Sequence, residues 1–283
     1  MSTMNNWENW VGQTRTTEAQ LHPEQANRMA VTLDRSPHYR AGDVLPPAWH
    51  WLYFHDLVGA SELGADGHPR RGVILPPVPF PRRMWASGSF VFHTPLRLGD
   101  TVTCTSVITS IVPKEGRSGS LCFVTIERTY TTGGALRLIE EQTLVYRESA
   151  REPTPTQPTL APVDADYVRR YALDSTALFR YSALTFNGHR IHYDADYCRA
   201  VEGYPNLVVH GPLIATLLLD LYVEQGQTLR RFSYRARSPL CLPHTLVVSG
   251  KASGTDTRLW ASDETGILVM EASGSPHPLA PSP

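Results

Sequence analysis

The chain has 283 residues, of which 41% are hydrophobic and 19% are charged, and its formal net charge at pH 7 is −1. These values are typical of a globular protein that can build a hydrophobic core, and the length suits one large domain or two of ordinary size. The balanced charge excludes the strong single-sign field of proteins that bind nucleic acids or membrane surfaces, so neither is an expected partner.

The cysteines and the apolar stretches predict a reducing, cytoplasmic location. Residues 1–17 contain no apolar run and are not expected to be a signal peptide, and the longest apolar stretch, Leu213–Leu219, is too short to span a bilayer. No Cys-x-x-Cys pair occurs, and the cysteines lie in apolar or strand-like stretches, which favours buried thiols over disulfides or zinc ligands. They are Cys104, Cys122, Cys198 and Cys241.

A segment rich in Pro and Thr divides the chain into two halves. Residues 151–162 have no periodic apolar pattern, which is typical of an extended linker. We therefore predict an N-terminal half over residues 1–150, a linker over 151–165 and a C-terminal half over 166–273. The remaining residues, 274–283, are rich in Pro and Ser and are expected to be poorly ordered.

In the first half, the apolar segment Ala48–Val58 follows two prolines and predicts a helix. Three alternating segments separated by turn clusters then predict an antiparallel meander. The expected strands are Thr101–Ile111, Leu121–Tyr130 and Leu136–Tyr146, with turns at 114–119 and 132–134.

The second half repeats this plan. Gly211–Glu224 has Pro in its first turn and is apolar nearly all round, so it predicts a helix that must be buried, and a sheet wrapped around it would bury it. The strands expected after it are Leu246–Ala252, Arg258–Asp263 and Ile267–Ala272, with a turn at 253–256. A long helix with an antiparallel meander, present twice, predicts the α+β class.

A short internal repeat supports this plan. Ser89–Val102 aligns without gaps with Ser233–Leu246, and Ser, Pro, two Leu and Thr coincide. Such a match indicates duplication of one fold. Chance similarity between two amphipathic strands is the alternative.

The segment Thr185–Asp194, followed by Leu207–Leu213, resembles the MaoC-like hydratases, most of which carry the signature Gly-Asp-x-Asn-Pro-x-His. The branch of mesaconyl-C4-CoA and itaconyl-CoA hydratases and mitochondrial-type 3-hydroxyacyl thioester dehydratases is the most similar, and Leu75–Ala86 also resembles it. The resemblance implies a double hotdog, in which two curved antiparallel sheets are each wrapped around a central helix. It places the catalytic motif in the C-terminal half alone.

The chain departs from this signature at the acid. The histidine matches as His192, but Asn187 replaces the Asp and Arg190 replaces the Pro. Hydration of an α,β-unsaturated thioester needs a base, and His192 is the natural one because the pKa of an imidazole can lie near the working pH. Asn187 can only hold and orient the water. One water would then serve a syn addition, with His192 taking a proton and returning one; an Asn-Gly turn is the alternative role of Asn187.

Gly211 opens the predicted buried helix, so its backbone N–H can stabilise the thioester oxygen. Tight packing of the helix start against the sheet is its alternative role. His189, His192 and Asp194 are spaced as metal ligands could be, but no fourth ligand follows nearby, and no metal is expected. No cofactor is expected either, since coenzyme A would be part of the substrate.

A substrate carboxylate would need an arginine, ideally one that binds it in a bidentate manner. The candidates are Arg190, Arg82 and Arg83, and the candidates for the phosphates of CoA are Arg235 and Arg237. For each of them, a structural or surface ion pair is the alternative.

The leading hypothesis is therefore a reversible hydratase that converts itaconyl-CoA or mesaconyl-C4-CoA to citramalyl-CoA, as in itaconate degradation. The alternatives are a 3-hydroxyacyl-thioester dehydratase of fatty-acid metabolism, a hotdog thioesterase and a non-catalytic acyl-CoA binding protein. A dicarboxylate substrate requires a buried arginine at the acyl end, whereas a fatty-acyl substrate requires an apolar tunnel. Because a double hotdog already supplies two copies of the fold, both a monomer and a homodimer fit the sequence.

Overall fold

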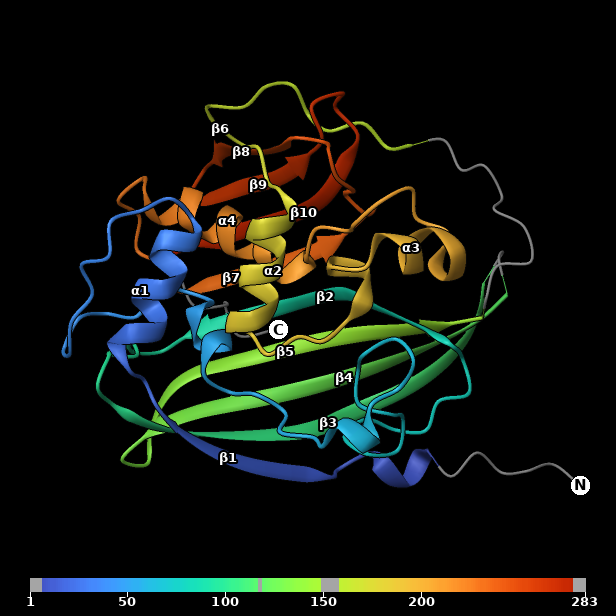
Figure 1. The fold of residues 1–283 in the computed structure, drawn as a ribbon. Coiled ribbons are helices and arrows are strands. Elements are labelled where there is room, and N and C mark those ends of the chain that lie inside the picture. The colour runs from blue at the N-terminus through green and yellow to red at the C-terminus, as the bar shows by residue number, and fades with distance from the viewer. Residues whose placement is uncertain (1–6, 117–118, 149–157, 277–283) are drawn as a thin grey trace, which may run out of the picture.

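The protein is built on one antiparallel sheet of ten strands, seen in a computed structural model that describes residues 7–116, 119–148 and 158–276. The strand order is β1-β3-β4-β5-β2-β7-β10-β9-β8-β6, so five strands from each half join edge to edge at β2 and β7 (Figure 1). The first-half strands are β1 (Thr14–Gln20), β2 (Arg82–Phe92), β3 (Thr101–Gly116), β4 (Gly119–Thr132) and β5 (Ala135–Arg147). The second-half strands are β6 (Tyr167–Tyr171), β7 (Arg231–Ala236), β8 (Leu246–Ser253), β9 (Asp256–Ser262) and β10 (Leu268–Ser275).

Both predicted meanders are confirmed, with strand ends that differ by a few residues. The largest difference is in β3, which continues to Gly116 where a turn was predicted from residue 114. The four cysteines are confirmed as buried free thiols. Residues 151–157 of the predicted linker and 277–283 of the predicted tail lie outside the described residues, so the division into halves stays a prediction. Strand β10 continues to Ser275, two residues into the predicted tail.

The helices are α1 (Pro23–Thr32), α2 (Ser175–Leu184), α3 (Ala195–Tyr197) and α4 (Gly211–Val223), and short helical turns are η1 (Glu8–Trp10), η2 (Trp49–Leu52), η3 (Ala60–Glu62), η4 (Arg190–His192) and η5 (Cys198–Glu202). The predicted buried helix is confirmed as α4, because every residue from Leu213 to Tyr222 is buried and the helix packs on β7 to β10. Among the described helices, none combines the length and apolar character needed to cross a membrane.

The helix predicted over residues 48–58 is wrong. Only the 3-10 turn η2 forms: Ala48 before it is left-handed, with a φ of 66°, and Tyr53 after it has left the helical region, with a φ of −123°. The second part of the segment cannot be buried on all sides either, since Leu57 is 77% exposed. Among the described residues, the segment after Pro46-Pro47 therefore supplies no counterpart of α4.

The two copies of the internal repeat meet at the junction of the halves. Ser89 of β2 lies opposite Ser233 of β7, so the first residues of the two aligned segments pair with each other. The corners match as well: Val44 bridges to Arg97 and Val208 bridges to Cys241, and Arg97 and Cys241 are both the ninth residue of their aligned segment. Equivalent pairing at equivalent positions supports duplication of one fold over chance similarity.

Gly88 permits the close approach of strands at this junction. A Cβ atom built on Gly88 would lie 2.1 Å from the Tyr234 hydroxyl and 2.4 Å from the backbone oxygen of Glu141. We expect Gly88→Ala to lower the free energy of unfolding by about 3 kcal/mol, because a backbone oxygen cannot move away cheaply. Chemical denaturation measures this, with Ser233→Ala as the control on the exposed side of the same junction; equal stability of the two variants would contradict it.

Candidate active site

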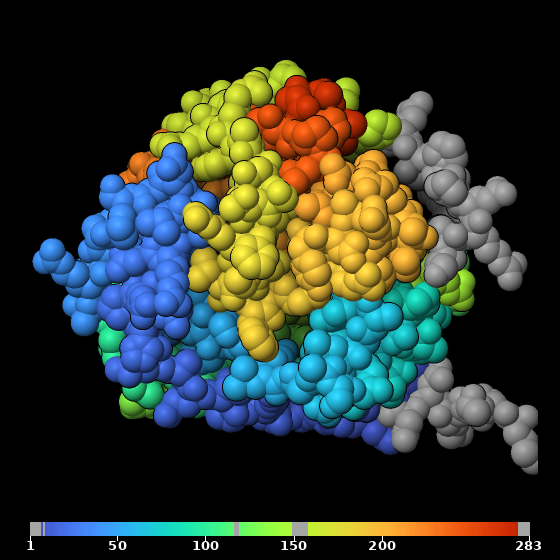
Figure 2. Space-filling view, viewed as in Figure 1, coloured from blue at the N-terminus to red at the C-terminus, as the bar shows by residue number. Residues whose placement is uncertain are grey.

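A cavity of 1240 Å³ lies between the two halves of the chain. The space-filling view shows a hollow between the yellow α2 region and the light-blue first-half loops, with green atoms of the first-half sheet at its base (Figure 2). The walls include Ile108, Ile126 and Leu144 of β3 to β5. Trp51 of η2 lines the same cavity.

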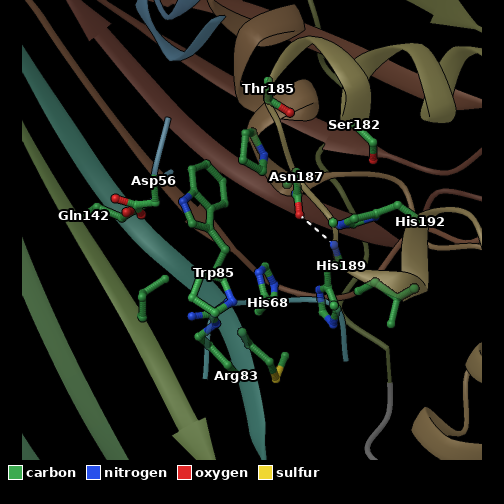
Figure 3. A pocket seen from close by; sticks show the side chains of 18 of the residues that line it. Asp56, His68, Arg83, Trp85, Gln142, Ser182, Thr185, Asn187, His189 and His192 are labelled. Carbon is green, nitrogen blue, oxygen red and sulfur yellow. Dashed lines mark hydrogen bonds between the residues drawn. The ribbon is translucent and has the colours of Figure 1, made fainter. Parts of the chain in front are cut away.

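The motif segment reaches the cavity through a turn after α2. The Asp174 side chain caps the start of α2 by accepting a hydrogen bond from the Ala177 N–H at 2.8 Å. After the helix, Phe186 is left-handed with a φ of 52°, and Asn187 lines the cavity. The Asn187 Oδ1 atom accepts a hydrogen bond from the His189 N–H at 3.0 Å (Figure 3). Asn187 thus makes the turn expected as its alternative role, and its water-holding role stays a prediction.

His192, in η4, lines the same cavity and is 6% exposed. Its Nδ1 atom lies 2.7 Å from the Val208 carbonyl oxygen. Because a carbonyl oxygen only accepts, Nδ1 carries the proton and Nε2 keeps its lone pair. Burial lowers the pKa of His192 to about 4. The imidazole is therefore neutral at neutral pH, as a general base must be.

His210 lies directly against this base. The rings of His192 and His210 are stacked, with centroids 3.6 Å apart and an interplanar angle of 18°. The Nε2 atom of His210 lies 2.8 Å from the Ser182 hydroxyl, and the residue is fully buried. Burial, followed by the neighbouring His192 and His189, holds the pKa of His210 well below its ordinary value. Sequence reasoning gave His210 no part in the site, because the contact joins residues 18 positions apart.

Gly211 begins α4 against a residue of the first half. A Cβ atom on Gly211 would lie 2.6 Å from Cε3 of Trp85, so the packing role expected as the alternative is present. The N–H groups in the first turn of a helix also have no carbonyl partner four residues earlier. Gly211 therefore lines the cavity with a backbone donor available by its position, and the oxyanion role stays a prediction.

A loop of the first half completes the site. The backbones of Gly67 and Gly188 approach so closely that a Cβ on Gly67 would lie 1.9 Å from the Gly188 carbonyl oxygen. This contact brings the ring of His68 to 4.3 Å from that of His189, as measured between centroids. Sequence reasoning missed His68, since a single histidine in a loop carries no local signal.

Of the five predicted arginines, two lie outside the lining of the cavity and three belong to it. Arg190 and Arg235 do not line the cavity, so their predicted role as substrate ligands is not supported. Arg190 holds Asp194 through Nε at 3.1 Å and Nη2 at 2.6 Å, and donates to the Ala65 carbonyl oxygen at 3.1 Å. Arg235 is exposed, on the face of β7 opposite the buried Tyr234.

Three predicted arginines do line the cavity. Arg82 lies 3.8 Å from Glu202, and Arg237 forms an ion pair with Glu271. Arg83 has no carboxylate within 4.0 Å among the described residues. Within the described residues, the histidines and Asp194 of the motif do not form a group of three or more ligands that could hold a metal ion.

A buried carboxylate beneath the cavity was not expected. Glu140 is fully buried and accepts hydrogen bonds from Tyr130 Oη at 2.7 Å and Trp51 Nε1 at 3.0 Å, and its carboxylate lies 3.2 Å from His50 Nε2. Arg128, which lines the cavity, lies 3.6 Å away. Burial opposes ionisation, but the charge of Arg128 and these hydrogen bonds overcome it and lower the pKa of Glu140 to about 2.

We expect Glu140→Gln to lower the free energy of unfolding by about 3 kcal/mol, because Arg128 would keep a largely buried charge without its partner. The double variant Arg128→Met with Glu140→Gln should recover part of this loss. The folded-state pKa is lowered, so the stabilisation is present above the ordinary pKa of a glutamate and is lost as the pH falls towards 2. Urea denaturation measures the stability of the single variant, of the double variant and of the wild type as the pH is lowered. An unchanged midpoint for Glu140→Gln would refute the stabilising role of the Glu140–Arg128 pair.

The stacking of His210 on His192 predicts how the pH dependence of kcat/KM changes when His210 is replaced. His210→Ala opens space for water beside His192, which should raise the pKa of the base, so the acid-side loss of kcat/KM should begin at a higher pH than in the wild type. His210→Phe keeps an apolar ring in place and should leave that limb where it is. A pH–rate profile of the three proteins tests this, and superimposable acid limbs would exclude control of His192 by His210.

The chain is similar to known proteins along most of its length. The model of the family "Hydroxyacyl-thioester dehydratase type 2" matches residues 48–242. The mesaconyl-C(4)-CoA hydratase of Chloroflexus aurantiacus is 45% identical over 269 residues, which cover 94% of this chain and 96% of that protein. A mitochondrial hydroxyacyl-thioester dehydratase type 2 of Schizosaccharomyces pombe is 29% identical, over 76% of this chain and 80% of that one.

Solved structures agree on the fold. A MaoC-like dehydratase of Phytophthora capsici superposes with a TM-score of 0.71 at 14% identity, over 95% of this chain and 97% of that chain. A Mycobacterium tuberculosis protein described as a double hotdog superposes with a TM-score of 0.53 at 14% identity, over 94% and 96%. The predicted α+β double-hotdog fold is confirmed, although within the described residues the segment 48–58 forms only the turn η2. The chain belongs to the hydroxyacyl-thioester dehydratase type 2 family of MaoC-like hotdog proteins.

Proposed function

We propose that the protein hydrates an unsaturated C5-dicarboxylyl-CoA thioester, mesaconyl-C4-CoA or itaconyl-CoA, reversibly to citramalyl-CoA. The observation that carries the proposal is the neutral His192, whose Nε2 lone pair is available in the same cavity as the start of the buried helix α4. The similarity to a mesaconyl-C(4)-CoA hydratase over nearly the whole chain supports the choice of acyl group.

In the proposed mechanism, one water lies between the Asn187 side chain and His192 Nε2. For mesaconyl-C4-CoA, whose double bond is conjugated with the thioester, His192 accepts a proton from this water while the oxygen attacks the β-carbon. Negative charge then develops on the thioester oxygen, and the backbone N–H of Gly211 stabilises it. The imidazolium returns the proton to the α-carbon, so that OH and H are added and His192 is regenerated. The addition is redox-neutral, and its proton transfers require no cofactor.

A second candidate keeps the chemistry and changes the acyl group. A 3-hydroxyacyl-thioester dehydratase of fatty-acid metabolism would use the same base and the same backbone donor. The apolar wall formed by Ile108, Ile126 and Leu144 favours it, as does the similarity to the Schizosaccharomyces pombe protein. Substrate length and charge, rather than the reaction, distinguish the two.

We also propose the partner, the assembly and the location of the enzyme. An acyl-CoA is the proposed substrate partner, and a monomer or homodimer is the proposed assembly. A reducing, cytoplasmic location is proposed as well, and the four buried free cysteines support it.

The test is a panel of mesaconyl-C4-CoA, itaconyl-CoA, crotonyl-CoA and a long-chain enoyl-CoA. Absorbance of the enoyl thioester follows the conjugated substrates, and chromatography of the product follows itaconyl-CoA, whose double bond is not conjugated. We expect the C5 dicarboxylates to give the highest kcat/KM, and His192→Ala to reduce turnover by about 10²- to 10⁴-fold. Asn187→Asp should stay folded and partly active, because it can still position water. Preference for the long chain would favour the second candidate, and near-normal turnover of His192→Ala would remove the base assignment.

A further inference from the structure

We propose that Arg83, His68 and His189 form the subsite that binds the free carboxylate of the acyl group, assembled across the two halves of the chain. The inference rests on the proposed function for its substrate, since it requires an acyl group that carries a carboxylate. It adds two histidines that the catalytic scheme does not use, one of them from the first half.

Charge is the first argument. Among the described residues, Arg83 has no carboxylate within 4.0 Å, although the other two predicted arginines in the cavity each have one. An arginine that lines a cavity without a counter-ion makes that part of the cavity attractive to an anion. The guanidinium group also suits a carboxylate because it can donate two parallel hydrogen bonds.

The two histidines lie in a row that leads from Arg83 to His192. The ring centroids of His68 and His189 are 4.3 Å apart, and those of His189 and His192 are 5.5 Å apart. In the close view, His68 lies between Arg83 and His189, with His192 beyond them (Figure 3). An anion held by Arg83 and His68 would therefore lie beside the catalytic base.

The substrate chemistry requires this short separation. In mesaconyl-C4-CoA the free carboxylate is attached to the β-carbon, the atom that the water attacks. A carboxylate subsite for this acyl group must therefore adjoin the base rather than lie at the far end of a tunnel. Arg128 is a poorer candidate, because the buried Glu140 already compensates its charge at 3.6 Å.

Arg83 supplies the one positive charge of the proposed subsite. Burial, followed by the charges of Arg83, His189 and His192, holds the pKa of His68 well below its ordinary value. Burial, then His192 and Arg83, lowers the pKa of His189 to about 3. Both imidazoles are therefore neutral at neutral pH, and each can donate one N–H to a carboxylate without adding a second buried charge.

The subsite depends on contact between the halves. A Cβ on Gly67 would lie 1.9 Å from the Gly188 oxygen, and a Cβ on Gly188 would lie 2.7 Å from the Gly67 oxygen, so the two loops touch through their backbones. The Arg190 N–H donates to the Asp66 carbonyl oxygen at 2.9 Å, and the Arg190 side chain donates to Ala65. Arg190 thus acts on the substrate only by positioning the loop that carries His68.

The test compares acyl groups that differ only in the carboxylate. Succinyl-CoA carries a carboxylate on its β-carbon and butyryl-CoA carries a methyl group there, and mesaconyl-C4-CoA and crotonyl-CoA form the matching unsaturated comparison. We expect Arg83→Met to weaken binding of succinyl-CoA, and to lower kcat/KM for mesaconyl-C4-CoA, by about 10- to 100-fold, the range for losing a charged hydrogen bond. The values for butyryl-CoA and crotonyl-CoA should change by less than about threefold.

His68→Phe should shift the same comparison in the same direction by a smaller factor, because it removes a neutral donor. Arg235→Met, an exposed arginine outside the cavity, is the matched control and should change none of the values. Calorimetry measures the binding of the saturated esters, so the subsite can be judged even if no substrate of the panel is hydrated.

The outcomes separate the two proposals. Equal losses for both members of a pair would show that Arg83 binds CoA or the thioester, and would overturn the subsite. No loss for either member would overturn it too. Selective loss of succinyl-CoA binding in an enzyme that hydrates neither unsaturated ester would support the subsite and refute the proposed function.

Discussion

The burial of α4 is the constraint on which the rest of the structure depends. Because this helix is apolar nearly all round, the second-half sheet must enclose it, and only its first turn reaches the cavity. His210 immediately precedes that turn and stacks on His192, and Gly211 packs against Trp85 of the first half. Enclosing one helix therefore fixes the base, the backbone donor and the junction of the halves together.

In the first half, the segment that corresponds to α4 forms no buried helix among the described residues. The segment after Pro46-Pro47 stops after the single turn η2, which lies on the wall of the cavity. The second half thus carries the motif with His192, and the first half contributes apolar wall residues such as Ile108, Ile126 and Leu144 to the cavity. The polar cluster around Glu140 lies beneath this space, so that buried charge is kept where a core would normally be apolar.

Burial also sets the protonation of the site. His192, His210, His189 and His68 all have lowered pKa values, and burial is the largest cause for each. These neutral imidazoles lie beside Arg83, which has no carboxylate within 4.0 Å among the described residues, so the cluster combines one positive charge with groups that can donate or accept a proton. The two halves must be docked for this to hold, since Arg83 and His68 come from the first half and the motif comes from the second.

The sequence by itself determined the elements and the motif. Alternation predicted the two meanders, and the apolar segment at 211–224 predicted α4 and, at its start, Gly211. The resemblance singled out Asn187 and His192, and all these signals are local in the chain. The tertiary structure alone decided which groups face each other. His68, His210 and Glu140 carry no local signal in the sequence. The predicted arginines could be assigned to ion pairs or to the cavity only from their partners in the structure. The helix predicted over 48–58 was wrong because a short turn on a cavity wall can have the same apolar composition. Contacts between residues distant in sequence depend on how the halves dock, and no local pattern encodes that docking.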